Sequence, residues 1–335
     1  MDINSEIKVS VLCLAYNHEK YIKECLESIL RQKTTFNYEI IVNDDASSDG
    51  TTAIIKKYEN KYPEIVHAIY QNENKYSKGV ALIEECLLPK ARGKYVALCE
   101  CDDKWLDENK LQYQYDYMEN HPECSMCTHN TLIHDLNATL KDTLFNPWTK
   151  VHILNEQEVF MDWKVHTSSY FMKKEEAYRP EKYRQYWFGD YVRLTMAYTR
   201  GDVVVLPYVM SQYNYGVTSG ALREVDASQL EVRKKKVLDR REYLKQLNQE
   251  TKERFNKIIN KRILMTELEA ESRKERDILR RSHNKAEAIK AARDIVKKPV
   301  YKCFFESLCI MDKIKELVRY KGYIFYPVWK KIWEK

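Results

Sequence analysis

Acidic and polar residues collect directly after three apolar runs near the start of the chain. The first run is followed by Tyr16-Asn17-His18, the second by Asp44 and Asp45, and the third by Glu100-Cys101-Asp102-Asp103. Carboxylate oxygens are good ligands for Mg²⁺ and Mn²⁺, and such a cation joins one or two carboxylates to a diphosphate. A carboxylate also accepts hydrogen bonds from a base N–H or from ribose hydroxyls. Two acidic clusters lying together would therefore suit one nucleotide with a divalent cation.

Each acidic cluster also has a purely structural interpretation. Asp44 and Asp45, followed by Ser47 and Ser48, could form a turn that caps the next helix. Residues 100–103 could form a solvated loop, although acidic residues are less common directly after a buried apolar strand. The occurrence of both clusters in one chain favours the nucleotide site. The chain has neither a G-x-x-x-x-G-K-[ST] loop nor a G-x-G-x-x-G segment after the first run, which disfavours P-loop NTPases and nicotinamide-binding Rossmann domains.

The clusters are expected to converge because the segments before them alternate between strand and helix patterns. Nearly continuous apolar runs predict strands at residues 9–15, 39–42, 66–70 and 95–99. Helical spacing and turn signals predict helices at residues 22–30, 49–62 and 79–88. This alternation is typical of a parallel sheet with right-handed crossovers, whose ligands bind outside the carboxyl ends of the strands. The three clusters should therefore meet at one edge of the sheet.

Beyond residue 105 the alternation is less regular. Helices are predicted for residues 109–120 and 187–198, and extended segments for 125–133, 168–172 and 203–206. From about residue 226 the pattern changes to long, highly charged helix with few breakers, interrupted by Pro299.

The three ordered segments resemble the family 2 glycosyltransferases of the GT-A fold. They read "VSVLCLAYNHEKYIKECLESILRQ", "YEIIVNDDASSDGT" and "GKYVALCECDDKW", and the resemblance covers roughly residues 8–220. It implies an α/β fold with a mixed, mostly parallel sheet flanked by helices, followed by a C-terminal helical extension. The implied domains are a catalytic domain over 1–222, with a nucleotide-binding half (1–104) and an acceptor-binding half (105–222), and a basic helical extension over 223–335.

The resemblance also implies roles for the residues of the acidic clusters. The implied nucleotide-binding residues are Leu14, Ala15, Tyr16, Asn17, Asp44, Asp45, Glu100 and Asp102. Among them, Asp45 would accept a hydrogen bond from the uracil of a UDP-sugar. Asp102 would lie near the ribose and Asp103 on a Mn²⁺ or Mg²⁺ ion, with the division of ribose and metal roles between these two residues left open.

Inverting sugar transfer also needs a general base that deprotonates the acceptor hydroxyl, and a positioned base contributes about 10²–10⁴ in rate. The candidate is Asp190, which follows Gly189 at the start of a predicted helix and resembles the acidic residue downstream in the family. The structural alternative is a helix N-cap. His166 and Thr167 resemble the segment that lines the acceptor cleft, and Trp105 is a further acceptor-binding candidate.

One segment departs from the family pattern. Residues 210–220 resemble its Y-R-x-H-x-G-G-V-x-S stretch, but Asn214 stands where an arginine is common and no histidine precedes Val217. The usual diphosphate contact from this stretch is therefore not expected, and the departure could mean another donor, another cation, or diphosphate binding by the basic tail.

Cysteine usage and hydropathy favour a cytoplasmic protein. The nine cysteines are odd in number and lie mostly in apolar runs, which is typical of free thiols rather than of a disulfide framework. Cys124 and Cys127 have C-x-x-C spacing but no second pair, and we expect them to fill core positions. No segment resembles a signal peptide or approaches the roughly 20 apolar residues of a spanning helix.

Charge divides the chain into an acidic front and a basic tail. The net charge of +6 is the balance of +13 in residues 221–335 and −7 in residues 1–220. Three interpretations of the tail remain open: a solvated helical hairpin, a homo-oligomer contact, or peripheral attachment to the inner face of an anionic membrane. Aromatic residues interleave with lysines in 301–335, which suits a membrane interface. Nothing resembles a nucleic-acid module.

The sequence therefore predicts an inverting, metal-dependent glycosyltransferase that uses a UDP-sugar. Its acceptor would be a glycan or a lipid-linked glycan of a bacterial surface polysaccharide such as capsule or lipopolysaccharide. The alternative from another class is a non-catalytic scaffold that binds partners through its helical tail. The scaffold is disfavoured by the presence of four acidic residues, Asp45, Asp102, Asp103 and Asp190, because a non-catalytic protein has no need of all four.

Overall fold

The chain divides into two compact units, Met1–Asp226 and Ala227–Lys335. The computed structural model describes residues 6–138, 141–162, 164–217, 230–272, 275–276, 278–279 and 285–308. All cysteines within these ranges are free thiols, as predicted, and Cys124 and Cys127 are buried core residues.

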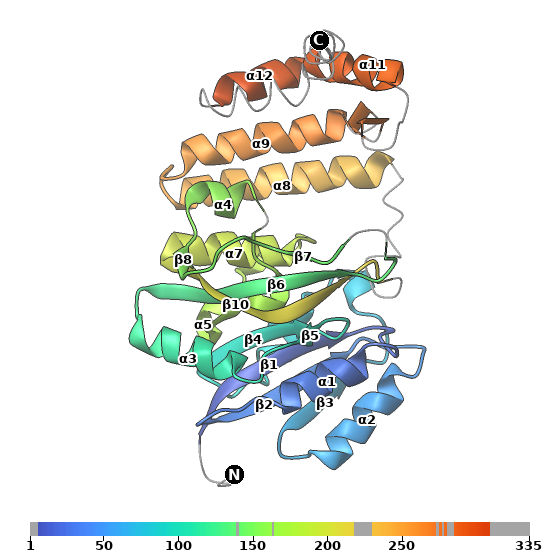
Figure 1. Ribbon diagram of the computed structural model, residues 1–335, viewed down its shortest axis with the longest axis vertical. Coiled ribbons are helices and arrows are strands. Elements are labelled where there is room, and N and C mark those ends of the chain that lie inside the picture. Colours follow the sequence, from blue (N-terminus) through green and yellow to red (C-terminus); the bar gives the residue numbers. More distant parts are fainter. Residues whose placement is uncertain are drawn as a thin grey trace, which may run out of the picture. The chain divides into compact units, whose positions relative to one another are not determined.

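The described strands of the first unit form one mixed sheet in the order β3-β2-β1-β4-β9-β6-β10-β5, with β7 beside β6 and β8 beside β10. Figure 1 shows α1 and α2 beside the strands β1–β3, and α7 beside β6 and β10. The strand bounds are β1 Ile7–Ala15, β2 Asn37–Asp44, β3 Val66–Tyr70, β4 Tyr95–Glu100, β5 Lys104–Trp105, β6 Cys124–Asp135, β7 Thr143–Leu144, β8 His152–Ile153, β9 Phe171–Lys173 and β10 Asp202–Tyr215.

The parallel half of the sheet confirms the predicted strands. β1 pairs in parallel with β2 and β4, and β2 pairs in parallel with β3. Residues such as Val11, Cys13, Ile40 and Val42 have no exposed surface, as expected for strands covered on both faces. The other half is mixed: β9 pairs antiparallel with β4 and β6, whereas β6 and β10 are parallel.

The helices of the first unit include the predicted ones with one exception. Their bounds are α1 Ile22–Leu30, α2 Thr51–Lys61, α3 Lys110–Asn120, α4 Glu156–Phe160, α5 Lys174–Ala177, α6 Glu181–Arg184 and α7 Gly189–Arg200. The predicted face of α1 is buried at Ile22, Cys25, Leu26 and Ile29.

Three predicted elements differ from the structure. The helix expected at 79–88 is instead a 3₁₀ turn, η1 (Tyr76–Lys78), followed by a short π-helix, η2 (Ile83–Leu87). The strand expected at 168–172 begins as a 3₁₀ turn, η3 (Thr167–Ser169), and becomes β9 only at Phe171. β10 runs nine residues past the predicted end at Leu206, because pairing with β6 and β5 holds a polar and aromatic segment in the sheet.

The second unit is helical, with α8 Leu230–Glu250, α9 Asn256–Glu271, α11 Lys285–Val296 and α12 Pro299–Ser307. Pro299 begins α12 rather than interrupting a helix, which suits a residue without an N–H at the first helical position. The second unit has a small apolar core of its own, which consists of Leu268, Ala292, Ile295, Tyr301, Phe304 and Leu308. No helix within the described ranges is long and apolar enough to cross a membrane.

Candidate functional site

The carboxyl ends of β1, β2 and β4 meet, as the sequence predicts. The strand register places Ala15 beside Asp44 and Leu14 beside Glu100. The backbone N–H groups of the residues that follow β2 and β4 donate to the carbonyls of Ala15 and Leu14, each at 2.9 Å. The acidic clusters therefore share one edge of the sheet, where ligands of such folds bind.

Asp44 takes part in the turn before α2. Its Oδ1 accepts the Ser47 N–H at 3.1 Å, and its Oδ2 accepts the Thr52 hydroxyl. The residue is buried. These contacts match the structural alternative for Asp44, and a nucleotide contact from its side chain stays a prediction.

The loop after β1 is tied to the same turn. Asn17 has a left-handed backbone (φ 56°), its N–H donates to the Ser47 hydroxyl at 3.0 Å, and its side-chain oxygen accepts the Ser48 N–H at 2.8 Å. Leu14, Tyr16 and Asn17 are partly exposed, whereas Ala15 is buried. The two loops thus form a fixed rim with three accessible residues beside Asp45.

Asp45 is hydrogen-bonded by the loop after β3, a contact that the sequence analysis did not predict. Its two carboxylate oxygens accept the backbone N–H groups of Lys75 and Tyr76, at 2.9 and 3.0 Å. The residue is 2% exposed. These two hydrogen bonds and the burial of Asp45 account for its position, and the predicted contact with the uracil remains a prediction.

Asp102 and Asp103 carry two buried oxygens that suit a cation. Asp102 Oδ1 and Asp103 Oδ2 have no hydrogen-bond partner in the described part of the chain. Burial, and then the charges of Asp102 and Glu100, raise the pKa of Asp103 well above its usual range. A divalent cation would relieve the repulsion among these carboxylates and supply the missing partner.

No group of three or more His, Cys, Asp or Glu side chains in the described ranges is arranged to hold a metal ion by itself. Mg²⁺ sites commonly combine one or two carboxylates with phosphate oxygens and water. Asp102 and Asp103 supply the carboxylate part of such a site.

Asp190 lies close enough to Glu100 for its charge to raise the pKa of the Glu100 carboxyl. The side chain of Glu100 keeps exposed surface, and desolvation by its surroundings, followed by the charges of Asp102 and Asp190, raises its pKa to about 8. α7 has Phe188 at its N-cap without a side-chain cap, so the N-cap alternative for Asp190 is wrong. Asp190 lies in the first turn, where its Oδ1 accepts the Tyr191 N–H at 2.8 Å.

His166 lies against the acidic pair. Its ring stacks on Tyr213 with centroids 4.3 Å apart, and its Nδ1 is 2.9 Å from the Ser168 hydroxyl and 3.5 Å from Asp103 Oδ2. Burial lowers the pKa of His166 to about 3, so the ring is neutral. Thr167 is more exposed than His166 and Trp105, the other two predicted acceptor residues.

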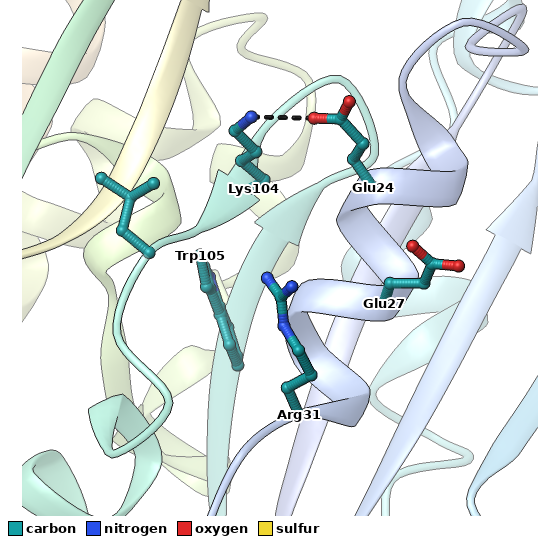
Figure 2. A pocket seen from close by; sticks show the side chains of 6 residues that line it. Glu24, Glu27, Arg31, Lys104 and Trp105 are labelled. Carbon is teal, nitrogen blue, oxygen red and sulfur yellow. Dashed lines mark hydrogen bonds and ion pairs between the residues drawn. The ribbon is translucent and has the colours of Figure 1, made fainter.

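Trp105 is 1% exposed, so its ring has almost no surface for an acceptor in this conformation. The buried Lys110 ammonium lies over the ring, 3.9 Å from its centroid, and donates to Gln114 Oε1 at 2.7 Å. The other edge of Trp105 lines a polar pocket of about 230 Å³ between α1 and β5 (Figure 2), and the strand-edge acids do not line it. In this pocket Lys104 pairs with Glu24 at 2.8 Å.

A buried ion cluster beside Asp190 was missed by sequence reasoning. Glu84 on η2 accepts hydrogen bonds from Arg179 at 2.6 and 3.1 Å and from Arg193, and all three residues are buried. Gly189 lies so close to Arg179 that an added Cβ would be 2.8 Å from its guanidinium. The cluster therefore fixes the start of α7, which carries Asp190. The available signal was a pair of acidic residues, Glu84 and Glu85, inside an otherwise apolar run.

Sequence comparison identifies relatives of the first unit. The sequence model described as Glycosyl transferase family 2 matches residues 10–178. An uncharacterised protein of Mycobacterium tuberculosis is 32% identical over 206 residues, which are 61% of this chain and 58% of the relative. The putative teichuronic acid biosynthesis glycosyltransferase TuaG of Bacillus subtilis is 39% identical over 110 residues (33% of this chain, 41% of the relative). This chain thus spans at most 58% of the length of these relatives.

Two solved structures share the fold. Staphylococcus aureus TarS 1–349 in complex with UDP-GlcNAc has a TM-score of 0.59 and 17% identity, over 87% of this chain and 81% of that chain. The mannosyltransferase PcManGT of Pyrobaculum calidifontis, in complex with GDP-Man and Mn²⁺, has a TM-score of 0.50 and 15% identity, over 100% of this chain and 89% of that chain.

Proposed function

The chain belongs to glycosyl transferase family 2 and is a GT-A-fold glycosyltransferase, and from this premise we propose that it transfers a sugar from a UDP-sugar with inversion. The observation that carries the proposal is the meeting of Asp45, Glu100, Asp102 and Asp103 at one edge of the sheet, with two unpartnered buried carboxylate oxygens among them. Family membership favours this enzyme over the scaffold alternative.

The nucleotide is proposed to lie along the rim formed by Leu14, Tyr16 and Asn17. We propose UDP as the nucleotide because the sequence resemblance implies it, and the UDP-GlcNAc in the TarS complex supports that choice. Asp102 and Asp103 would hold Mn²⁺ or Mg²⁺, which when bound offsets the charge of the donor diphosphate. The Mn²⁺ in the PcManGT complex supports a cation of this class.

The general base is proposed to be Asp190. Its carboxylate would take the proton from the acceptor hydroxyl as the oxygen attacks the anomeric carbon, and the leaving diphosphate departs on the opposite face. The Glu84–Arg179–Arg193 cluster holds the first turn of α7 and so orients this carboxylate. The acceptor is proposed to enter past Thr167, with His166 supporting Asp103 rather than binding the acceptor directly.

The acceptor is proposed to be a glycan or a lipid-linked glycan of a bacterial surface polysaccharide. The name of TuaG, a putative teichuronic acid biosynthesis enzyme, supports this class of pathway. The proposed catalytic domain covers residues 1–222 and the helical extension 223–335, with peripheral membrane contact or self-association assigned to the extension.

The Asp190→Asn variant tests the base assignment. We expect the release of UDP from a UDP-sugar, in the presence of an acceptor extract, to fall by about 10²–10⁴-fold. UDP binding should be unchanged, because the variant keeps the shape of the side chain and only removes its ability to accept a proton. Asp116→Asn, an exposed change on α3, is the matched control. Wild-type turnover in Asp190→Asn would remove the assignment.

A further inference from the structure

Asn214, near the end of β10, contacts both residues of the acidic pair. Its backbone N–H donates to Asp103 Oδ1 at 3.2 Å, and its side-chain Nδ2 donates to the carbonyl of Asp102 at 2.6 Å. The residue is 8% exposed. Asn214, more than a hundred positions away in sequence, therefore contacts the Asp103 carboxylate through its backbone N–H and the Asp102 peptide carbonyl through its side chain.

Strand pairing explains why Asn214 reaches this place. β5 runs antiparallel to β10, with Trp105 opposite Ser211 and Lys104 opposite Gln212. Continuing this register by two residues brings Asp102 opposite Asn214. Gln212 Nε2 then donates to Asn214 Oδ1 at 2.7 Å, which turns the Asn214 amide so that its Nδ2 faces the Asp102 carbonyl. The Asn214 amide thus accepts a hydrogen bond from Gln212 through its oxygen and donates one to the Asp102 carbonyl through its nitrogen.

The pattern of donors in the described part of the chain leaves one buried oxygen of each acidic residue without a hydrogen bond. Asn214 satisfies Asp103 Oδ1, whereas Asp103 Oδ2 and Asp102 Oδ1 have no hydrogen-bond partner among the described residues. The Asn214 amide is neutral, so it holds the peptide group between Asp102 and Asp103 without adding a positive charge that would compete with a divalent cation. Residues that orient metal ligands in this way typically contribute 10–100-fold to metal affinity or activity.

We propose that Asn214 is a positioning residue that fixes Asp102 and Asp103 in the orientation that binds the divalent cation. The inference rests on the proposed metal-dependent donor site. It assigns a role to the position at which this chain departs from the family pattern: Asn214 acts on the acidic pair rather than on the donor diphosphate.

The test is the Mn²⁺ requirement of UDP binding, measured by calorimetry over a series of Mn²⁺ concentrations. In Asn214→Ala we expect the half-saturating Mn²⁺ concentration to rise roughly 10–100-fold. UDP binding without metal should change little. Gln212→Ala, which frees the Asn214 amide, should raise the Mn²⁺ requirement in the same direction by a smaller factor.

Asn120→Ala is the matched control. Its Nδ2 also donates to a backbone carbonyl, that of Asp116 at 2.7 Å, but on the exposed face of α3. This control should leave the Mn²⁺ requirement unchanged. A wild-type Mn²⁺ requirement in Asn214→Ala overturns the inference. If Asn214→Ala does not give a cooperative melting transition, Gln212→Ala decides, and an unchanged requirement there has the same meaning.

The outcome separates this inference from the proposed function. If the wild-type protein binds UDP without any dependence on Mn²⁺ or Mg²⁺, the proposed metal dependence fails and the role of Asn214 fails with it. If the wild-type protein depends on the cation but the two variants do not differ from it, only the role of Asn214 is wrong.

Discussion

Lys110 illustrates how strongly burial changes the chemistry of a single residue in this protein. The side chain has no exposed surface and lies between the Trp105 ring and Gln114, with the thiols of Cys99 and Cys127 nearby. Burial lowers the pKa of the Lys110 ammonium to about 7. In the unfolded chain the same group would titrate near 10.5.

This shift predicts a pH dependence of stability. Between about pH 7 and 10.5 the unfolded chain holds more protons at Lys110 than the folded chain, so the free energy of unfolding rises with pH over this window. In Lys110→Met this contribution disappears. We therefore expect urea unfolding of the wild type to gain stability relative to Lys110→Met as the pH is raised from 7 to 9.5.

The Lys33→Met variant serves as the control, since the Lys33 side chain keeps 66% of its surface exposed in the folded protein, where it pairs with Glu108. The difference between wild type and this control should be constant over the same pH range. Parallel curves for wild type and Lys110→Met would contradict the account of Lys110 as a buried amine with a lowered pKa.

Among the elements, η2 has the clearest energetic role. Its single buried acid, Glu84, is the counter-charge of two buried arginines on other segments, Arg179 and Arg193. Removing one partner of a buried ion pair costs about 3–5 kcal/mol, because the remaining charge is left without compensation. In Glu84→Ala, the buried guanidinium groups of Arg179 and Arg193 both lose this counter-charge.

We expect Glu84→Ala to lower the free energy of unfolding by at least that amount, about 3–5 kcal/mol, in urea titrations. Glu85→Ala, its exposed neighbour on the same π-helix, should change it by less than about 0.5 kcal/mol. Similar stability of the two variants would show that the cluster does not support the fold at α7.

The elements that sequence predicted well are those with one simple period. β3 has the predicted bounds, and α1 buries the predicted face, since both are governed by local apolar patterns. The segment at 79–88 was mistaken for a regular helix because its apolar residues fit helical spacing, whereas the buried Glu84 binds partners 95 and 109 positions away. Such long-range pairing leaves little local signal.

The same distinction applies to the site. Asp45, Glu100, Asp102 and Asp103 could be placed together from sequence, because the carboxyl ends of neighbouring parallel strands necessarily share an edge. The contacts of Asn214 could not be predicted, because they depend on the path of β10. The hydrogen bonds from Lys75 and Tyr76 to Asp45 could not be predicted either, because they depend on the path of the loop after β3.

At the scale of the whole molecule, the two units differ in charge and in kind of core. The helical unit uses Tyr301, Phe304 and Leu308 in its own apolar cluster, so the beginning of the aromatic tail is structural. The remaining aromatic and basic part, residues 309–335, lies outside the described residues. It carries seven Lys and Arg against three Asp and Glu.

A truncation after Leu308 tests the proposed membrane contact and keeps every residue of the described helical core. Each basic residue near an anionic surface contributes about 1 kcal/mol. We expect the full chain to co-sediment with phosphatidylserine-containing vesicles at moderate salt, and the truncated chain to remain in the supernatant. Vesicles of phosphatidylcholine alone are the control. Equal behaviour of the two chains on anionic vesicles would assign the tail to another role.

The most direct measurement for the account as a whole is calorimetric titration of the wild-type protein with UDP, GDP and CDP, each with and without Mn²⁺. The account predicts that UDP binds and that its affinity depends on Mn²⁺, while GDP and CDP bind weakly or not at all. Absence of UDP binding in the presence of Mn²⁺, or a preference for GDP or CDP, would contradict the proposed donor site at the carboxyl ends of β1, β2 and β4.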